Sequence, residues 1–375
     1  MKPTPEDWLE RGIDPPAVRT VEGFFCTSGI AGADLTTGLL PAEPAEQFAL
    51  AFENLRSLLG EQGLEIEAIG LLNVYIRSRD ARPFIDPPWE AMFPDPERRP
   101  ARKTNEVRLP GAVQVQVQAF GRAGETCRSV EIPGLRHRAP LPMGAMVGST
   151  VFSSVIGGDD PATGALVSGT AEQIDQAFRN AALLMEQAGG TIEGINHMWA
   201  FMGDMGDAST MLDTYLEMFA DPQSRPARKT VPYALPGGLS IQLQITGDTG
   251  GRTGNFEVRG VGHHDPIPLA SRAGHLLQSS GIYGIDPSTS DMVEGGLQEQ
   301  TRASLDHIES LMAEAGGALE SVAGITVLVR GFGDMPWLAR AIEERFPAGS
   351  VPALRFVAYP LPEELFVQFH LTGWI

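Results

Sequence analysis

The chain has 375 residues, enough for two or three domains of ordinary size. With 42% hydrophobic and 20% charged residues, it has the composition of a globular protein that buries a core. Its 28 basic and 47 acidic residues give a net charge of −19, which disfavours nucleic acid and membrane surfaces as partners because both are anionic.

The two cysteines and the first residues bear on the cellular compartment. Cys26 and Cys127 form neither a disulfide framework nor a zinc-ligand pattern. Residues 1–7 lack the apolar stretch of a secretory signal, and no run of ~18 apolar residues predicts a transmembrane helix. We therefore expect a cytoplasmic protein whose first dozen residues are a polar lead-in.

One segment occurs three times, as RRPARKTNEVRLP at 98–110, SRPARKTVPYALP at 224–236 and SVPALRFVAYPLP at 350–362. Arg102, Arg228 and Leu354 are separated by 126 residues each (228 − 102 and 354 − 228), and Ser28, Ser154 and Ser280 keep the same interval. A period of this length is that of a complete small domain. The predicted domains are residues 13–122, 138–247 and 264–375, joined by linkers rich in Gly, Pro and charge.

Each copy predicts the same series of elements, beginning with a short strand that ends near Ser28 in the first copy. A helix follows, because Phe48, Phe52, Leu55 and Leu59 form one apolar stripe. Next come a strand at 72–76, a second helix, and a final strand that alternates strictly from 113 to 118. Two helices on one face of a mixed sheet predict an α+β layer in each copy.

The ordered set of motifs resembles the RidA (YjgF-type) family of enamine/imine deaminases. The set comprises "TSG", helix residues Gln47 and Asn54, Pro-Ala-Arg, Leu-Pro and the alternating strand. The resemblance implies a chorismate-mutase-like fold, homotrimers with sheets around a central β-barrel, and active sites in the clefts between subunits. Three fused copies would form a pseudo-trimer within one monomeric chain.

The resemblance also implies the site residues. The Arg of Pro-Ala-Arg, here Arg102 and Arg228, would bind the substrate carboxylate, since a guanidinium pairs with it bidentately; the alternative is an Arg that bridges to a neighbouring domain's acid. In the third copy Leu354 stands at this position and Arg355 one residue later, on the opposite strand face. We therefore expect a degenerate third site. The other expected substrate-binding residues are Thr104, Thr230, Ser28, Gly29 and Ser154.

The final strand carries the expected catalytic residues. At the position where the family has a Glu, this chain has Gln116, Gln242 and Gln368. A Gln orients a water but cannot act as a general base at neutral pH. We expect Gln116 and Gln242 to orient the attacking water, or alternatively all three to form a structural ladder at the centre.

The sequence also makes predictions for two lysines and for the histidines. Lys103 and Lys229 should point away from the Arg face and stay in solvent. The seven histidines form no ligand cluster, and no nucleotide-binding motif is present, so neither a metal nor another cofactor is expected.

Three functions remain open. The first is hydrolytic deamination of small enamine or imine carboxylates at inter-domain clefts. The second is different chemistry on a larger carboxylated substrate, such as a tautomerase, lyase or chorismatase-like reaction. The third is non-catalytic binding of a small carboxylate, which the absence of Glu favours.

Overall fold

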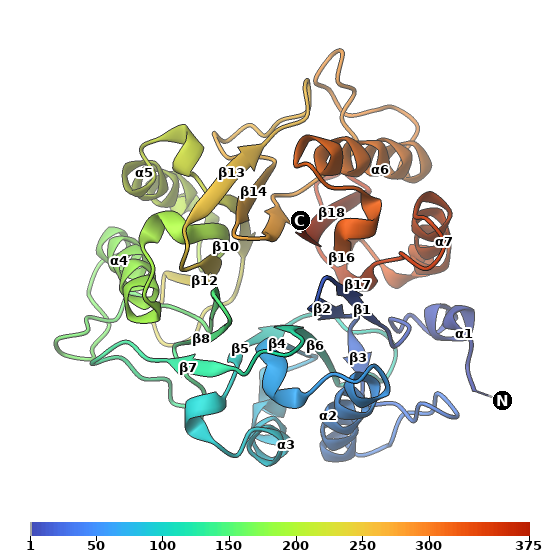
Figure 1. Ribbon diagram of the computed structural model, residues 1–375, viewed down its shortest axis with the longest axis horizontal. Helices are drawn as coiled ribbons and strands as arrows, with labels where there is room; N and C mark the ends of the chain where they lie inside the picture. Colours follow the sequence, from blue (N-terminus) through green and yellow to red (C-terminus); the bar gives the residue numbers. More distant parts are fainter. Residues whose placement is uncertain (1) are drawn as a thin grey trace.

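The computed structural model describes residues 2–375 and has three similar lobes arranged in chain order around a centre. Figure 1 shows the helices on the outside of each lobe and the sheets facing inward. Each lobe contains one six-stranded sheet with two helices on its outer face. The expected threefold repetition of an α+β unit is therefore confirmed.

The first lobe follows the predicted series. Phe48, Phe52, Leu55 and Leu59 are all buried, so the apolar stripe of its long helix lies on the sheet. Its elements are β1 (Val18–Val21), β2 (Phe24–Thr27), β3 (Ile30–Ala31), α2 (Pro44–Glu61), β4 (Ile69–Ile76), α3 (Asp86–Met92), β5 (Ala101–Glu106) and β6 (Val115–Arg122).

The second lobe repeats this order, but its six strands include the edge strand β7 (Arg128–Val130) and no named counterpart of β3. Gly189 follows its long helix with a φ of 95°, a left-handed conformation that favours glycine and ends the helix. Its elements are β7 (Arg128–Val130), β8 (Gly144–Val147), β9 (Thr150–Ser153), α4 (Thr170–Ala188), β10 (Ile195–Met202), α5 (Ala208–Met218), β11 (Ala227–Pro232) and β12 (Ile241–Asp248).

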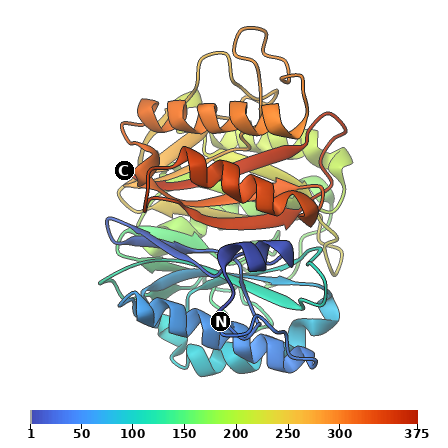
Figure 2. The ribbon, with the colours of Figure 1, turned by 90° about the vertical axis from the view of Figure 1, so that its right-hand side faces the viewer.

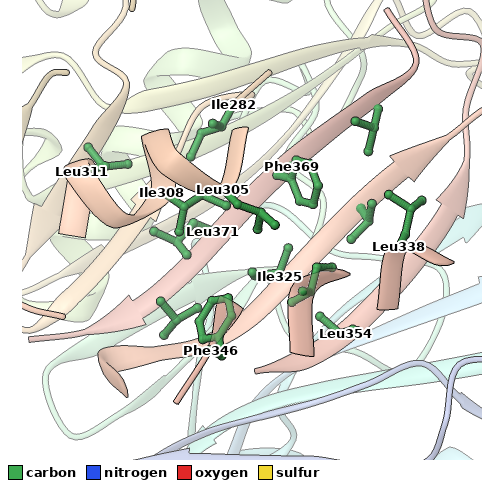
Figure 3. Packing of buried hydrophobic residues seen from close by; sticks show 14 of the residues in the cluster. Ile282, Leu305, Ile308, Leu311, Ile325, Leu338, Phe346, Leu354, Phe369 and Leu371 are labelled. Atoms are coloured by element: carbon green, nitrogen blue, oxygen red, sulfur yellow. The ribbon is translucent and has the colours of Figure 1, made fainter. Parts of the chain in front are cut away.

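The third lobe has a complete core of its own, which Figure 3 shows between its helices and sheet. Leu305 and Ile308 point from the long helix onto Ile325 and Phe369 of the strands. Its elements are β13 (Arg252–Phe256), β14 (Ala270–Ala273), β15 (Leu276–Ser279), α6 (Leu297–Glu314), β16 (Val322–Val329), α7 (Met335–Arg345), β17 (Ala353–Ala358) and β18 (Val367–Trp374).

The sheets are mixed, as expected. The strand of the Pro-Ala-Arg segment pairs in parallel with the strand after the long helix, whereas the final strand pairs with it antiparallel, as in β5–β4–β6. The same arrangement recurs in β11–β10–β12 and β17–β16–β18. β5, β11 and β17 are therefore edge strands, and each edge faces the next lobe around the ring.

Two expectations need correction. The segments predicted to be linkers contain β7 and β13, which each add a strand to the following sheet. In addition, the central β-barrel is not formed: none of the three sheets in the described chain closes on itself, and one isolated β-bridge, Arg108 to Ala358, is the pairing that joins two lobes there. The inner faces meet mainly through side chains, including Phe24, Phe152 and Leu276 from the three lobes.

The N-terminal segment before β1 forms an arm across the boundary between the third and first lobes. It contains α1 (Pro5–Glu10), which packs against α7 (Figure 2). Trp8 and Ile13 are buried against the first lobe, and Leu9 joins the core of the third. No helix within residues 2–375 is long and apolar enough to cross a membrane.

Candidate functional site

Neighbouring lobes meet at three boundaries, which we call the first, second and third cleft. In the first cleft, the backbone N–H of Arg102 on β5 donates to Ser154 Oγ of the second lobe at 3.0 Å. In the second cleft, Arg228 N on β11 donates to Ser280 Oγ of the third lobe at 2.9 Å. The third cleft lies between β17 and β2 of the first lobe, and there Ser28 Oγ instead accepts from Ala17 N of the arm at 3.0 Å.

Arg102 points toward the helix layer. It is in register with Leu72, a core residue beneath the helices, and parallel neighbours in register share a face. Its guanidinium lies 4.7 Å from the Trp89 ring, and Nη2 is 2.9 Å from Asp86 Oδ1. Nε and Nη1 are buried and have no hydrogen-bond partner within residues 2–375, so two guanidinium nitrogens remain available as donors.

Arg228 has the same orientation with different partners. Its Nη2 lies 2.6 Å from Asp265 Oδ2, in the segment that leads into the third lobe, and its guanidinium is 4.9 Å from the Tyr215 ring. This ion pair matches the alternative of an Arg that bridges to a neighbouring acid. Burial lowers the pKa of both guanidinium groups, and the nearby carboxylates oppose this shift.

Lys103 points to the opposite face, into the first cleft. Its Nζ donates to Gln242 Oε1 at 3.2 Å and lies 4.1 Å from the Phe201 ring and 4.8 Å from the Tyr233 ring. Only 2% of Lys103 is exposed and no carboxylate in the described chain pairs with it, so the expectation of a solvated lysine was wrong. Burial, and then the charges of Arg82 and Arg79, lower its pKa to about 7.

Lys229 repeats this arrangement in the second cleft. Its Nζ donates to Gln368 Oε1 at 2.8 Å and lies 5.4 Å from the Tyr359 ring. Burial lowers its pKa to about 8. The expected water-orienting residue Gln242 therefore contacts the lysine beside the Pro-Ala-Arg arginine, and Gln368 does the same in the next cleft.

A histidine lies beside each of these two sites. Burial, and then the charges of Arg102 and Lys103, lower the pKa of His137 to about 4. His263 has its pKa lowered to about 4 by burial, Lys229 and Arg228, against the influence of Asp265. In each of these two clefts, the arginine and the lysine leave the edge strand on opposite faces, yet both lie near the same histidine ring.

The third cleft holds a carboxylate supplied by the arm. Asp14 Oδ2 lies 2.8 Å from Arg355 Nη1, and Asp14 Oδ1 accepts from the Phe356 backbone N–H at 3.1 Å. The Gly29 backbone N–H also donates to this carboxylate, and Gln116 Nε2 lies 3.5 Å from Oδ2. Asp14 is 1% exposed. Burial raises its pKa to about 6, against the opposing effects of Arg355 and the backbone donors.

The structure brings some of the predicted site residues together and separates others. Gln116 and Gly29 lie in the third cleft, not beside Arg102, and Ser28 bonds Pro15 O of the arm at 2.8 Å. Arg355 lies on the opposite face from Leu354, as expected, and in this cleft it pairs with the internal carboxylate of Asp14. Thr104 and Thr230 are half-buried, on the arginine face of the edge strands.

A separate cavity of about 390 Å³ lies at the centre, where the three lobes meet. Gln118, Gln244 and His370 of the final strands line it, together with Tyr75 and Trp199. The polar groups that line the centre thus lie two residues further along each strand than Gln116, Gln242 and Gln368.

The family model described as "Endoribonuclease L-PSP" matches residues 15–122, 138–245 and 268–361 of the chain. The chain belongs to this family, which includes the RidA and YjgF proteins. It carries three copies of the family domain in tandem.

Curated relatives match one copy at a time. A RutC family protein of Pyrococcus abyssi is 25% identical over 109 residues, which cover 29% of this chain and 86% of the relative. A bovine protein named 2-iminobutanoate/2-iminopropanoate deaminase is 32% identical over 107 residues, 28% of this chain and 77% of its own length. A solved structure named as a putative endoribonuclease from Thermotoga maritima is 27% identical, with a TM-score of 0.31, and covers 32% of this chain and 96% of its own.

Sequence reasoning missed three functional candidates, Lys103, Lys229 and Asp14. The lysines carried a signal in the repeat itself, because a basic residue recurs at 103, 229 and 355 while the preceding arginine does not. Asp14 carried none, because only folding brings the arm to a strand more than 300 residues away.

Proposed function

We propose that the first and second clefts bind small enamine or imine carboxylates and hydrolyse them to the keto acid and ammonia. The observation that supports this most is the third cleft, where a carboxylate already lies between a basic side chain, two backbone N–H groups and a final-strand glutamine. The other two clefts likewise have a basic side chain beside a final-strand glutamine, and the acids found there pair with Arg102 and Arg228 on the other strand face.

The carboxylate subsite follows from this correspondence. Lys103 and Lys229 occupy the strand position of Arg355, so each is the cation beside the substrate carboxylate. The backbone N–H groups of Thr104 and Val155, or of Thr230 and Gly281, correspond to those of Phe356 and Gly29. Arg102 has two guanidinium nitrogens without a partner in the described chain and adds positive potential near His137, at the edge of the same cleft.

The reaction class follows from the neighbouring glutamines and from the relatives that carry deaminase names. Water adds to the carbon of the protonated C=N bond, the C–N bond then breaks, and ammonia leaves as the carbonyl forms. Gln242 and Gln368 lie beside the lysines and orient the water. No carboxylate takes the water's proton, so solvent or the released amine accepts it, which predicts a slower enzyme than one with a positioned base.

Ammonia release tests this proposal. 2-Iminopropanoate would be generated in situ by an amino-acid oxidase, and its hydrolysis compared for wild type, Lys103→Ala, Lys229→Ala and the double variant. We expect wild type to accelerate the reaction, each single variant to keep part of the rate, and the double variant to lose all of it. Arg179→Ala, which removes an exposed ion pair on α4, is the control and should leave the rate unchanged.

No acceleration by folded wild type would overturn the deaminase proposal. The lack of any acid at the three glutamine positions specifically favours a second candidate, a protein that binds small carboxylates without turnover. Titration with pyruvate separates the two: saturable binding that the double variant loses, with no ammonia release, would identify the binding protein.

A further inference from the structure

We propose that the third cleft is a carboxylate-binding site whose ligand is the chain's own Asp14. The arm thereby closes the ring at its only boundary without a covalent linker. This inference concerns a cleft that the proposed function does not use, and it holds whether or not the other clefts catalyse a reaction.

The first argument is the number and geometry of donors around one carboxylate. Arg355 Nη1 at 2.8 Å, Phe356 N at 3.1 Å and Gly29 N all serve Asp14. A side chain at Gly29 would overlap the carboxylate, so the glycine makes room for it. A carboxylate that is only 1% exposed requires such donors, because burial of an unpaired charge is costly.

The second argument is that the cleft has donors beyond those that Asp14 uses. Arg355 Nε and Nη2 are buried and find no partner in the described chain, and the guanidinium lies 4.2 Å from the Tyr75 ring. A site with spare donors can accept a free carboxylate once Asp14 is removed.

The third argument is the position of the arm. The chain runs continuously from the first lobe to the second and from the second to the third, but only non-covalent contacts join the third lobe to the first (Figures 1 and 2). The arm spans this boundary, with Trp8 in a cluster of first-lobe residues and Leu9 in the third-lobe core. Asp14 adds a buried ion pair where a linker is missing.

The prediction is that a small monocarboxylate replaces the missing group in an Asp14→Ala variant. Truncation to alanine removes one carboxylate, a group the size of formate. We would measure the thermal midpoint of wild type, Asp14→Ala and Asp14→Asn in rising formate, with chloride at equal ionic strength as reference. We expect Asp14→Ala to be less stable than wild type and to regain ~3 °C in saturating formate.

Controls separate this site from general salt effects and from the other clefts. Asp7→Ala removes an exposed carboxylate of the same arm and should show no more formate response than wild type. Asp14→Asn keeps the volume filled and should respond equally little. Wild type reports any formate bound at Lys103 and Lys229, so the additional response of Asp14→Ala belongs to the third cleft.

The outcomes are distinct from those of the deaminase test. A formate-dependent gain confined to Asp14→Ala supports the third site even if no ammonia is released by any variant. An equal response in all variants, or none in Asp14→Ala, overturns it. If Asp14→Ala does not fold without formate, its refolding yield is measured instead: dependence on formate but not chloride supports the site, and an unchanged yield contradicts it.

Discussion

At the scale of single residues, alternation along one edge strand separates two kinds of cation. Arg102 and Arg228 face the helix layer, pair with acids and stack on aromatic rings. Lys103 and Lys229 face the clefts and have glutamine and aromatic neighbours instead. Burial without a paired carboxylate in the described chain lowers the pKa values of the two lysines to about 7 and about 8.

This desolvation predicts a pH-dependent gain in stability for Lys103→Met. The folded-state pKa of about 7 lies below the unfolded value of about 10.5, so the unfolded chain binds more protons between them and wild-type stability rises with pH across that range. Below pH 7 the buried charge destabilises the fold, and the neutral methionine should gain on the order of 2 kcal/mol. Urea unfolding at pH 6 and pH 9 checks this; an equal gain at both pH values would contradict it.

The same shift predicts how carboxylate binding depends on pH. Lys103 binds a carboxylate in its charged form, so affinity for pyruvate should fall as pH rises above about 7. A neutral lysine that acted as a general base would instead make the rate rise through the same pH. Calorimetric titrations between pH 6 and pH 9 distinguish the two roles.

The same substitution of glutamine by glutamate should have opposite effects in two of the clefts. Gln242→Glu places a carboxylate beside Lys103, at the 3.2 Å hydrogen bond, and should raise the lysine pKa and supply the missing base. Gln116→Glu places one beside Asp14, where like charges repel, and should cost on the order of 1–3 kcal/mol. Thermal unfolding and ammonia release of both variants would show this contrast, and equal effects would contradict the assignment of the clefts.

At the scale of elements, local sequence patterns predict the helices and most strands, but they do not predict β7 and β13. The stripe on α2 is buried, and the second helix of each lobe ends just before a phenylalanine, at 93, 219 and 346. β7 and β13 lack a clear alternating pattern and lie at sheet edges, so only pairing with β8 and β14 makes them strands.

The third lobe has kept its core although its cleft differs. Ile308 of α6 is fully buried among strand residues, so Ile308→Ala should lower the free energy of unfolding by about 2–5 kcal/mol. Urea denaturation followed by tryptophan fluorescence measures this loss. A change below ~0.5 kcal/mol would mean that this helix does not pack as described.

At the scale of the whole molecule, three sheets face one centre without forming one sheet. Residues from all three lobes form a shared apolar cluster, including Phe24, Phe152 and Leu276, which a separated lobe would expose to water. The third lobe closes against the first through the arm. We therefore propose that the chain needs no further copy to complete its sites.

A closed ring predicts a monomer in solution. Light scattering during size-exclusion chromatography should give the mass of one chain, 40.2 kDa, over a wide concentration range. Deletion of residues 2–16 removes the arm and should favour self-association, because the apolar groups beneath Trp8 and Ile13 become exposed. A wild-type mass of two or more chains would contradict the closed ring.

The sequence by itself determined the three copies, the order of elements and the family, because these depend on local periodicity and on landmarks 126 residues apart. It also placed Arg355 on the opposite face from Leu354, since alternation along a strand is a local property. Only the tertiary structure decided the composition of the clefts. Lys103 meets Gln242 across 139 residues and Arg355 meets Asp14 across 341, and such contacts depend on how lobes pack, which no local pattern records.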